Sequence, residues 1–420
     1  MQDPWDDWIP GVLNREQMRE LCDRELFSLG VPFDKKILDE SSIDLYLTEK
    51  AYRMLKGSVK PSGTVPYSYF LKQPHLAVEH PPDQDGIFHL DAKHTYVFKL
   101  RERLGKQLEG LGFHGQATAK SSVGRVDVLA RLIVDGMDTY ECFSPKCFDC
   151  GCGDMYLEIT PITFNVLVKP NTSLSQLRLF YGDPKNVEVE GRELFRAVYG
   201  EVEKSDGSLT VDISNTKIGG LEAAAFYTEV NPDPAKDLRP PIALWTEEGQ
   251  RFGTALPATY WKLKPADEKS RLEISSEEFY ILRSKERISV PPGIAVYCRA
   301  SDETIGEMRI HYAGFVHPLF GRRHSGGKGT PLIFEVRGHQ VNVSLAHGER
   351  MANLTFYRMS KDAIEEPNKK KGTPKGSENE SNASSYEDQE LNLSKFFQPW
   401  PTKLKPKEGK QDGTVEADQS

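Results

Sequence analysis

The chain has 420 residues, of which 38% are hydrophobic and 10% aromatic, enough to bury one large core or two ordinary ones. Its formal net charge of −8 gives no general attraction to nucleic acid or anionic membrane, so any anion it binds must be held by a local cluster of cations. No stretch approaches the roughly 18 uninterrupted apolar residues of a membrane span, and the acidic start MQDPWDDWIPG lacks the regions of a signal peptide. We therefore expect a cytoplasmic globular protein without direct nucleic-acid or membrane binding.

The order of elements begins with a helix and continues with strands. Met18, Leu21 and Leu26 have helical spacing and Asn14 is a suitable cap, which predicts one short amphipathic helix near the amino terminus. After it, short segments rich in Val, Ile, Tyr and Phe alternate with Gly, Pro, Asn and Asp turns. These segments are IDLYL, HTYVFKL, VDVLARLIV, DMYLEI, TFNVLV and SQLRLFY. The pattern predicts a mainly β fold of the sandwich, jelly-roll or barrel type.

The β-rich pattern occurs twice. The stretch from Met155 to Tyr181 lies without a gap on the stretch from Leu332 to Arg358, and charged and Asn positions match as well as apolar ones. The matched pairs include Glu158 with Glu335, Asn165 with Asn342, Tyr96 with Tyr280 and Glu102 with Glu286. We therefore predict tandem duplicated β domains, the first over residues 1–205 and the second over residues 206–360.

The last segment, residues 361–420, is charged and contains Pro and Gly, which predicts a disordered tail. Inside it, Leu393, Phe396 and Phe397 fall on one helical face. Two readings are open: a short helix that forms in a partner's groove, or a tail with scattered aromatics. A replication sliding clamp, whose ligands similarly end in paired aromatics, is the partner to test.

A cluster of donors precedes the strand VDVLARLIV. In AKSSVGR, the cations of Lys120 and Arg125 and the hydroxyls of Ser121 and Ser122 together offer the donors that a polyphosphate requires. Further along, Glu158 lies in mid-strand among apolar neighbours. Burial would raise the pKa of such a carboxylate towards the range useful for a general base, whereas on a half-exposed strand the same residue would simply face solvent.

These residues resemble a known family. AKSSVGR, FDCGCG, YLEI and PNTSLSQLRL are similar, in this order, to the motifs of the deoxycytidine triphosphate deaminase branch of the trimeric dUTPase superfamily, and in particular to its long, duplicated bacterial type. The resemblance covers most of the first repeat and extends weakly over the second. It implies a jelly-roll-like barrel, a trimeric homo-oligomer with sites between subunits, and Mg²⁺ that arrives with the triphosphate and takes no part in the chemistry. The implied reaction is hydrolytic deamination of dCTP to dUTP and ammonia, on the route to dTTP.

The resemblance also assigns roles to residues. Glu158 would take a proton from the water that attacks C4 of cytosine, and Ser121 would bind the base or that water. Ser122 and Arg125 would hold phosphate or position the water, and Lys120 stands where the family has a basic residue. Asp149 matches the Asp of the turn that lies under the sugar.

Three features depart from the family pattern. Cys150 and Cys152 replace the proline and aromatic of the turn, and an insertion that includes Cys142 and Cys147 separates Arg125 from that turn. No obvious carboxy-terminal lid follows Tyr181, so lid residues would come from the second repeat or another subunit. A catalytic zinc is rejected because no H-x-E precedes PKCFDC. A structural zinc is open as an alternative to free thiols, with the four ligands Cys142, Cys147, Cys150 and Cys152.

The second repeat is predicted to be a degenerate site. Aligning Gly124 with Gly306 places three acids over the donors of the first repeat. These acids are Asp302 over Lys120, Glu303 over Ser121 and Glu307 over Arg125, and His317 replaces Asp149. Because acids repel a triphosphate, we interpret Glu335 as a relic or a structural acid. Two other functions are open: a dUTP diphosphatase, alone or combined with deamination, and a non-catalytic nucleotide-binding regulator.

Overall fold

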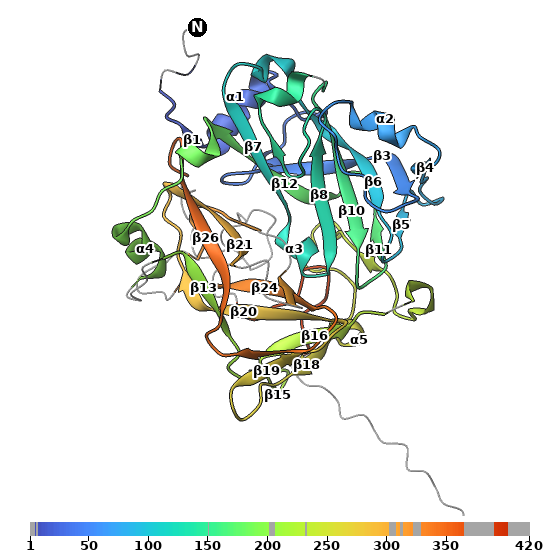
Figure 1. Ribbon diagram of the computed structural model, residues 1–420, viewed down its shortest axis with the longest axis vertical. Coiled ribbons are helices and arrows are strands. Elements are labelled where there is room, and N and C mark those ends of the chain that lie inside the picture. Colours follow the sequence, from blue (N-terminus) through green and yellow to red (C-terminus); the bar gives the residue numbers. More distant parts are fainter. Residues whose placement is uncertain are drawn as a thin grey trace, which may run out of the picture.

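The computed structural model describes residue 5 and residues 7–149, 151–200, 206–231, 233–301, 308–310, 314–321, 329–364 and 390–401. Within these ranges the chain is mainly β, with two large sheets that lie one above the other in Figure 1. The predicted β fold is confirmed. The helices are α1 (Arg15–Asp23), α2 (Tyr67–Leu71), α3 (Ser121–Gly124), α4 (Arg192–Tyr199) and α5 (Pro257–Tyr260).

The first large sheet has a main path of seven strands in the order β8, β10, β6, β3, β12, β7, β9. Their bounds are β3 Ile43–Met54, β6 Tyr96–Leu104, β7 Phe113–Ala119, β8 Val128–Val134, β9 Cys142–Phe143, β10 Asp154–Pro161 and β12 Ser173–Tyr181. Shorter strands flank it: β1 Gly11–Val12, β2 Phe27–Ser28 and β4 Ala77–Glu79. A separate small sheet joins β5 Phe88–Leu90, β11 Val166–Val168 and β17 Ile242–Ala243, with β17 parallel to β11.

The second large sheet repeats the path of the first, in the order β22, β24, β20, β13, β26, β21, β23. Their bounds are β13 Ser208–Asp212, β20 Glu278–Ile288, β21 Ile294–Ala300, β22 Met308–Ile310, β23 Gly314–Val316, β24 Thr330–Gly338 and β26 Arg350–Arg358. The sheet is extended by β16 Ala225–Glu229 and β18 Lys262–Lys264. Two separate antiparallel pairs accompany it: the hairpin of β14 Thr216–Ile218 with β15 Leu221–Ala223, and the long-range pair of β19 Arg271–Ile274 with β25 Val343–Ala346.

Side-chain hydrogen bonds repeat together with the strands. The Tyr96 hydroxyl accepts the Asp91 N–H at 3.0 Å, and the Tyr280 hydroxyl accepts the Ser275 N–H at 3.0 Å. In the same way, the Asn165 amide oxygen accepts the Ala92 N–H at 2.8 Å and its counterpart Asn342 accepts the Ser276 N–H at 2.9 Å. The predicted duplication is therefore confirmed down to individual polar contacts. The exact domain boundaries stay predictions.

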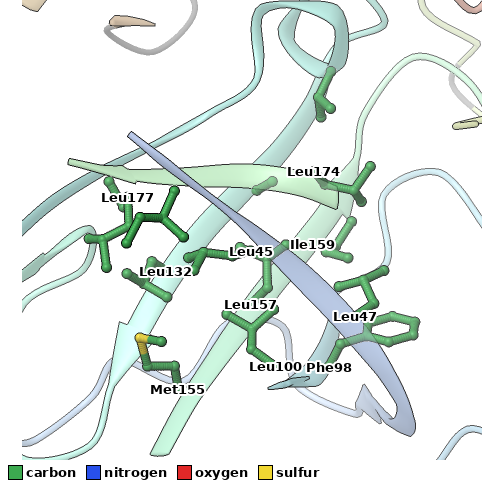
Figure 2. Close-up of a cluster of buried hydrophobic side chains, with 14 of the residues drawn as sticks. Leu45, Leu47, Phe98, Leu100, Leu132, Met155, Leu157, Ile159, Leu174 and Leu177 are labelled. Carbon is green, nitrogen blue, oxygen red and sulfur yellow. The ribbon is translucent and has the colours of Figure 1, made fainter. Parts of the chain in front are cut away.

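Strand periodicity explains how each repeat buries its interior. In β8, Val128, Ala130, Leu132 and Val134 are buried in one hydrophobic core, whereas Arg131 and Ile133 point to the opposite face. Figure 2 shows leucines and a methionine from several strands meeting in this core, among them Leu45, Leu132 and Leu157. The second repeat has its own core, which includes Phe334 and Val336 of β24.

The predicted amino-terminal helix is confirmed as α1. The Asn14 side chain accepts the Gln17 N–H at 3.0 Å, and the Gln17 side chain accepts the Asn14 N–H at 3.1 Å. This reciprocal capping satisfies two otherwise unpaired donors at the start of the helix. Met18 and Leu21 are buried beneath it. No helix within the described ranges is long and apolar enough to cross a membrane.

The carboxy-terminal prediction needs a correction. Most of residues 361–420 lies outside the described residues, but residues 390–401 are described and pack against the rest of the chain. Phe396 and Phe397 are 3% and 1% exposed, and the Phe397 ring lies 5.4 Å from that of Tyr260 and 6.1 Å from that of Trp261. The apolar residues are therefore part of this chain's own core rather than an exposed motif, because burying a phenylalanine stabilises the fold by about 2–3 kcal/mol. Binding to a sliding clamp stays a prediction.

Candidate functional site

The predicted donor cluster forms a single turn between β7 and β8. Val123 is fully buried and anchors the turn, and the Arg125 N–H donates to the Ser121 carbonyl at 3.1 Å to close it. Lys120, in extended backbone just before the turn, pairs with Asp44 at 2.5 Å. Because Val123 points into the first core, the polar side chains on either side of it point away from that core. Figure 1 shows α3 between the two repeats, next to β24.

The carboxy-terminal segment lies on this turn. The Ser394 hydroxyl donates to the Ser122 carbonyl at 2.7 Å, and Arg125 donates to the Asn392 carbonyl at 3.4 Å. Between these two contacts and Phe396, Lys395 is exposed to solvent but lies close enough to Lys120 to feel its charge. Removal of water by the surrounding protein, followed by repulsion from Lys120, lowers the pKa of Lys395 to about 8. The segment therefore adds a third cation beside the predicted cluster.

Glu335 of the second repeat faces the same turn. Ile333, Glu335 and Arg337 alternate along β24 and share the face that points away from the second core, and Arg337 forms an ion pair with Asp127 just after α3. Glu335 is 9% exposed, and burial raises its pKa to about 7. The Arg125 charge opposes this shift in the pKa of Glu335, and the Asp127 charge adds to it. Among the described residues, the Glu335 carboxylate accepts a hydrogen bond from its own backbone N–H and forms no ion pair.

Glu158 has very different surroundings. It is 1% exposed and lies opposite Arg131 of β8, which donates to one carboxylate oxygen from Nε at 3.1 Å and also from Nη2. The Ser58 hydroxyl donates to the same oxygen at 3.1 Å, and the Tyr140 hydroxyl donates to the other at 3.2 Å. Tyr140 also covers the Arg131 guanidinium, 4.1 Å from its ring. Among the described residues, none of the partners of Glu158 belongs to the 120–125 turn, so the structure does not bring these two predicted elements together.

Asp149 is also separate from the turn. It ends the short 3-10 helix Pro145–Asp149, which packs beside Gly136 at the carboxyl end of β8. The 120–125 turn precedes the amino end of that strand, and seven residues of strand span roughly 20 Å. The Asp149 side chain is exposed and has no hydrogen bond to the described part of the chain. The sequence-predicted set is therefore divided between the two ends of β8.

The counterpart of Asp149 in the second repeat lies nearer to the turn. The His317 Nδ1 is 3.1 Å from the Ser41 hydroxyl, and its Nε2 is 3.7 Å from Asp39, both in the first repeat. Burial lowers the pKa of His317, and the charges of Asp44 and Lys120 also act on it. Sequence reasoning missed that Lys395 joins the predicted cluster and that His317 lies near it, because the first-repeat groups that they approach lie more than two hundred residues away in the sequence.

The cysteines do not gather into one ligand set in the described residues. Cys150 lies outside them, and Cys142, Cys147 and Cys152 do not bring their sulfurs together. The Cys142 sulfur is instead 3.0 Å from the Thr139 hydroxyl. Cys152 approaches Asp135 and Asp154, but Asp154 is already paired with Lys99 at 3.0 Å and Arg103 at 2.7 Å. The structural zinc stays a prediction without support from these contacts. Likewise, Asp302, Glu303 and Glu307 lie outside the described residues.

Comparison with family models identifies the chain. Residues 9–183 match the model of the 2'-deoxycytidine 5'-triphosphate deaminase (DCD) N-terminal domain, and residues 249–397 match the model of the DCD C-terminal domain. The chain belongs to the DCD family. The C-terminal model extends through Phe397, so the segment that lies on the 120–125 turn is part of the DCD C-terminal domain. This confirms the resemblance on which the sequence interpretation rested.

One solved structure agrees with the DCD assignment. The crystal structure of 2'-deoxycytidine 5'-triphosphate deaminase from Agrobacterium tumefaciens is 26% identical, with a TM-score of 0.71 over 84% of this chain and 96% of that chain. Salicylate 1,2-dioxygenase from Pseudaminobacter salicylatoxidans reaches a TM-score of only 0.12 at 9% identity, over 85% and 86% of the two chains, and bears no weight. The search of curated proteins found no match.

Proposed function

We propose that this DCD-family chain hydrolyses dCTP to dUTP and ammonia at an inter-repeat site, defined as Lys120, Ser122, Arg125, Glu335 and Lys395. The observation that carries the proposal is the ion pair between Asp127 of the first repeat and Arg337 of the second. Arg125 and Glu335 each lie two residues from a member of this pair, and the Arg125 charge acts on the Glu335 carboxyl. A group of phosphate-binding donors and a titratable carboxylate thereby share one location. Membership of the DCD family supports the choice of substrate.

In the proposed reaction, Glu335 is the general base. Its carboxylate accepts a proton from water as the water oxygen bonds to C4, and this proton passes to N3 of the pyrimidine. The second proton of the water passes by the same carboxylate to the exocyclic amino group, the C4–N4 bond breaks, and ammonia leaves. A pKa near 7 suits a group that must both accept and return protons at neutral pH. Such a base contributes on the order of 10²–10⁴ in rate.

The cations of the site suit the triphosphate. Lys120, Arg125 and Lys395 bring three donors of positive charge to one turn, and charge-assisted hydrogen bonds to phosphate are roughly twice as strong as neutral ones. Mg²⁺ would enter bound to the substrate phosphates. Because Lys395 approaches from the carboxy-terminal segment, this segment supplies the part of a lid that the sequence lacks after Tyr181.

Glu158, predicted from the sequence as the base, stays the alternative. Its carboxylate already accepts hydrogen bonds from Arg131, Ser58 and Tyr140, so a water would have to displace one of them. We propose that Glu158 has a structural role instead. The matched pair Glu158→Gln and Glu335→Gln separates the two assignments, since both variants remove one buried charge at equivalent strand positions.

The experiment is incubation of the purified chain with dCTP and Mg²⁺ while ammonia and pyrophosphate are measured together. The proposal expects ammonia alone, a loss of at least a hundredfold in ammonia release for Glu335→Gln, and retained dCTP binding by that variant. Pyrophosphate would indicate a diphosphatase or a bifunctional enzyme, and neither product would indicate a nucleotide-binding regulator. If Glu335→Gln releases ammonia at the normal rate and Glu158→Gln does not, Glu158 is the general base.

A further inference from the structure

Two short tripeptides face each other across the repeats with complementary charges. Arg125-Val126-Asp127 follows α3 in the first repeat, and Glu335-Val336-Arg337 lies in β24 of the second. Val126 and Val336 are both fully buried, each in the core of its own repeat. The charged residues on either side of each valine point toward the other repeat, where Arg337 pairs with Asp127 and Arg125 approaches Glu335.

Asp127 adopts a backbone conformation that an aspartate takes up only at a cost. Its φ is +56°, in the left-handed region, where residues other than glycine cost about 1 kcal/mol or more. Its N–H donates to the Gly124 carbonyl at 2.9 Å, and its own carbonyl accepts the Ile162 N–H at 3.0 Å. A glycine would satisfy both backbone contacts without the cost. The side chain must therefore account for the presence of an aspartate.

The carboxylate of Asp127 is completely buried and contacts one side chain from each repeat, Thr163 and Arg337. It accepts a hydrogen bond from the Thr163 hydroxyl within the first repeat. From the second repeat it accepts two from Arg337, one from Nε at 3.3 Å and one from Nη2. Such a two-pronged contact between a guanidinium and a carboxylate fixes direction as well as distance.

We infer that the Asp127–Arg337 pair is a positioning device for the reaction, which holds Arg125 at a fixed distance and orientation from Glu335. Each member of the pair lies two residues from the residue that it positions, Asp127 from Arg125 and Arg337 from Glu335. A displacement of about 1 Å between reacting groups costs up to about a hundredfold in rate. This inference rests on the proposed function, because the Asp127–Arg337 pair positions the reacting groups only if Glu335 is the general base.

The pair also acts on the base through charge. Among the described residues, Arg125 and Asp127 of the first repeat act on Glu335 through their charges, and Glu335 in turn acts on the Cys298 thiol of β21. Arg337 lies two residues from Glu335 on the same face of β24. Removing the Asp127 charge while Arg337 remains positive would favour ionised Glu335, and removing the Arg337 charge while Asp127 remains negative would disfavour it. The two single variants should therefore move the pKa of Glu335 in opposite directions.

The test compares Asp127→Asn, Asp127→Gly, Arg337→Gln and the double variant Asp127→Asn, Arg337→Gln with the wild-type chain, by ammonia release from dCTP between pH 5 and 9. Each single variant should lose about tenfold or more in kcat, and the double variant should lose no more than the worse single one. The acidic limb of the pH profile should shift down in Asp127→Asn and up in Arg337→Gln, and return towards the wild-type position in the double variant.

Two controls separate positioning from stability alone. Thr163→Val removes a hydrogen bond to Asp127 but keeps the pair, and should leave the acidic limb in place. Asp127→Gly relieves the backbone cost, so it should unfold at a higher temperature than Asp127→Asn yet be equally impaired in kcat. If the wild-type chain is active and the Asp127 and Arg337 variants have the same kcat and the same acidic limb as the wild type, the positioning inference is wrong and the proposed function still stands. A wild-type chain that releases no ammonia would instead overturn the proposed function, and the inference with it.

Discussion

Glu158 and Glu335 occupy equivalent strand positions, opposite Val97 and Ile281 respectively, but within the described part of the chain a guanidinium ion pair is found for Glu158 and not for Glu335. Arg131, Ser58 and Tyr140 compensate the buried charge of Glu158. Glu335 has Arg125 nearby, but burial still dominates and raises the pKa of Glu335. The two repeats thus hold buried acids at equivalent positions with different surroundings: Glu158 is hydrogen-bonded to three side chains, whereas burial is the main influence on Glu335.

This difference predicts opposite effects on stability. The pKa of Glu335 is raised from 4.5 to about 7 in the folded chain, so the native state binds the extra proton between these pH values and loses stability as pH rises through 7. Glu335→Gln should therefore raise the free energy of unfolding at pH 8, by up to about 3 kcal/mol, and have little effect at pH 4.5. Thermal unfolding at the two pH values measures this. An equal gain at both would contradict it.

Glu158→Gln should have the reverse effect. It leaves Arg131 facing a neutral amide at a site where the guanidinium is only 22% exposed. Breaking a partly buried ion pair costs about 1–3 kcal/mol, so unfolding should occur several degrees lower at pH 8. The double variant Glu158→Gln, Arg131→Met should recover part of the loss, because it removes the orphaned charge as well. A single variant as stable as the wild type would show that the ion pair has no structural role.

The wild-type pH profile should reflect the pKa of Glu335. Because the base must be ionised to accept a proton, kcat/KM should rise with pH and level off above about 7. Measurement of ammonia release across pH 5–8 at low dCTP checks the position of this limb in the free enzyme. A limb that stays in place in Glu335→Gln, in whatever activity remains, would mean that another group is the base.

Lys395 should take up a proton when dCTP binds. Partial removal of water by the surrounding protein, together with the Lys120 charge, lowers the pKa of the Lys395 ammonium to about 8 in the free chain, and an adjacent triphosphate would raise this pKa again. Calorimetry at pH 8.5 in buffers of different ionisation enthalpy should show this uptake, and Lys395→Gln should reduce it and weaken dCTP binding about tenfold or more. Lys262→Gln, at an exposed lysine paired with Glu229, is the matched control and should change neither.

Truncation should expose the role of the carboxy-terminal segment in folding. A chain that ends after Lys361 loses Phe396 and Phe397 from the core and should be less stable by on the order of 5 kcal/mol. A chain that ends after Pro401 keeps both rings and should unfold at the wild-type temperature. If both truncated chains unfold together with the wild type, the aromatic residues do not contribute to the core in solution.

Individual strands and the amino-terminal helix could be predicted from the sequence, because they depend on local residue patterns. Strand alternation predicted β8 and β10, and Asn14 with its helical spacing predicted α1, because these signals lie within a few residues of one another. The duplication was predictable because whole strands match. The pairing of the 120–125 turn with Glu335 was not, since it depends on how two repeats dock across some 200 residues of chain. Phe396 and Phe397 were predicted to lie in a disordered tail, because the composition around them favours disorder. Their burial depends on tertiary contacts, such as that between Phe397 and Tyr260, which local sequence does not reveal.

Strand β17 limits where the chain can be divided, because it joins the two halves of the sequence in one small sheet. Ile242 and Ala243 belong to the second half of the sequence but pair with Val166 and Leu167 of the first repeat. A gene split at the sequence boundary would therefore yield an amino-terminal product with the unpaired edge of β11 exposed to other chains. The two halves of the chain are thus held together by a shared sheet as well as by the backbone that links them.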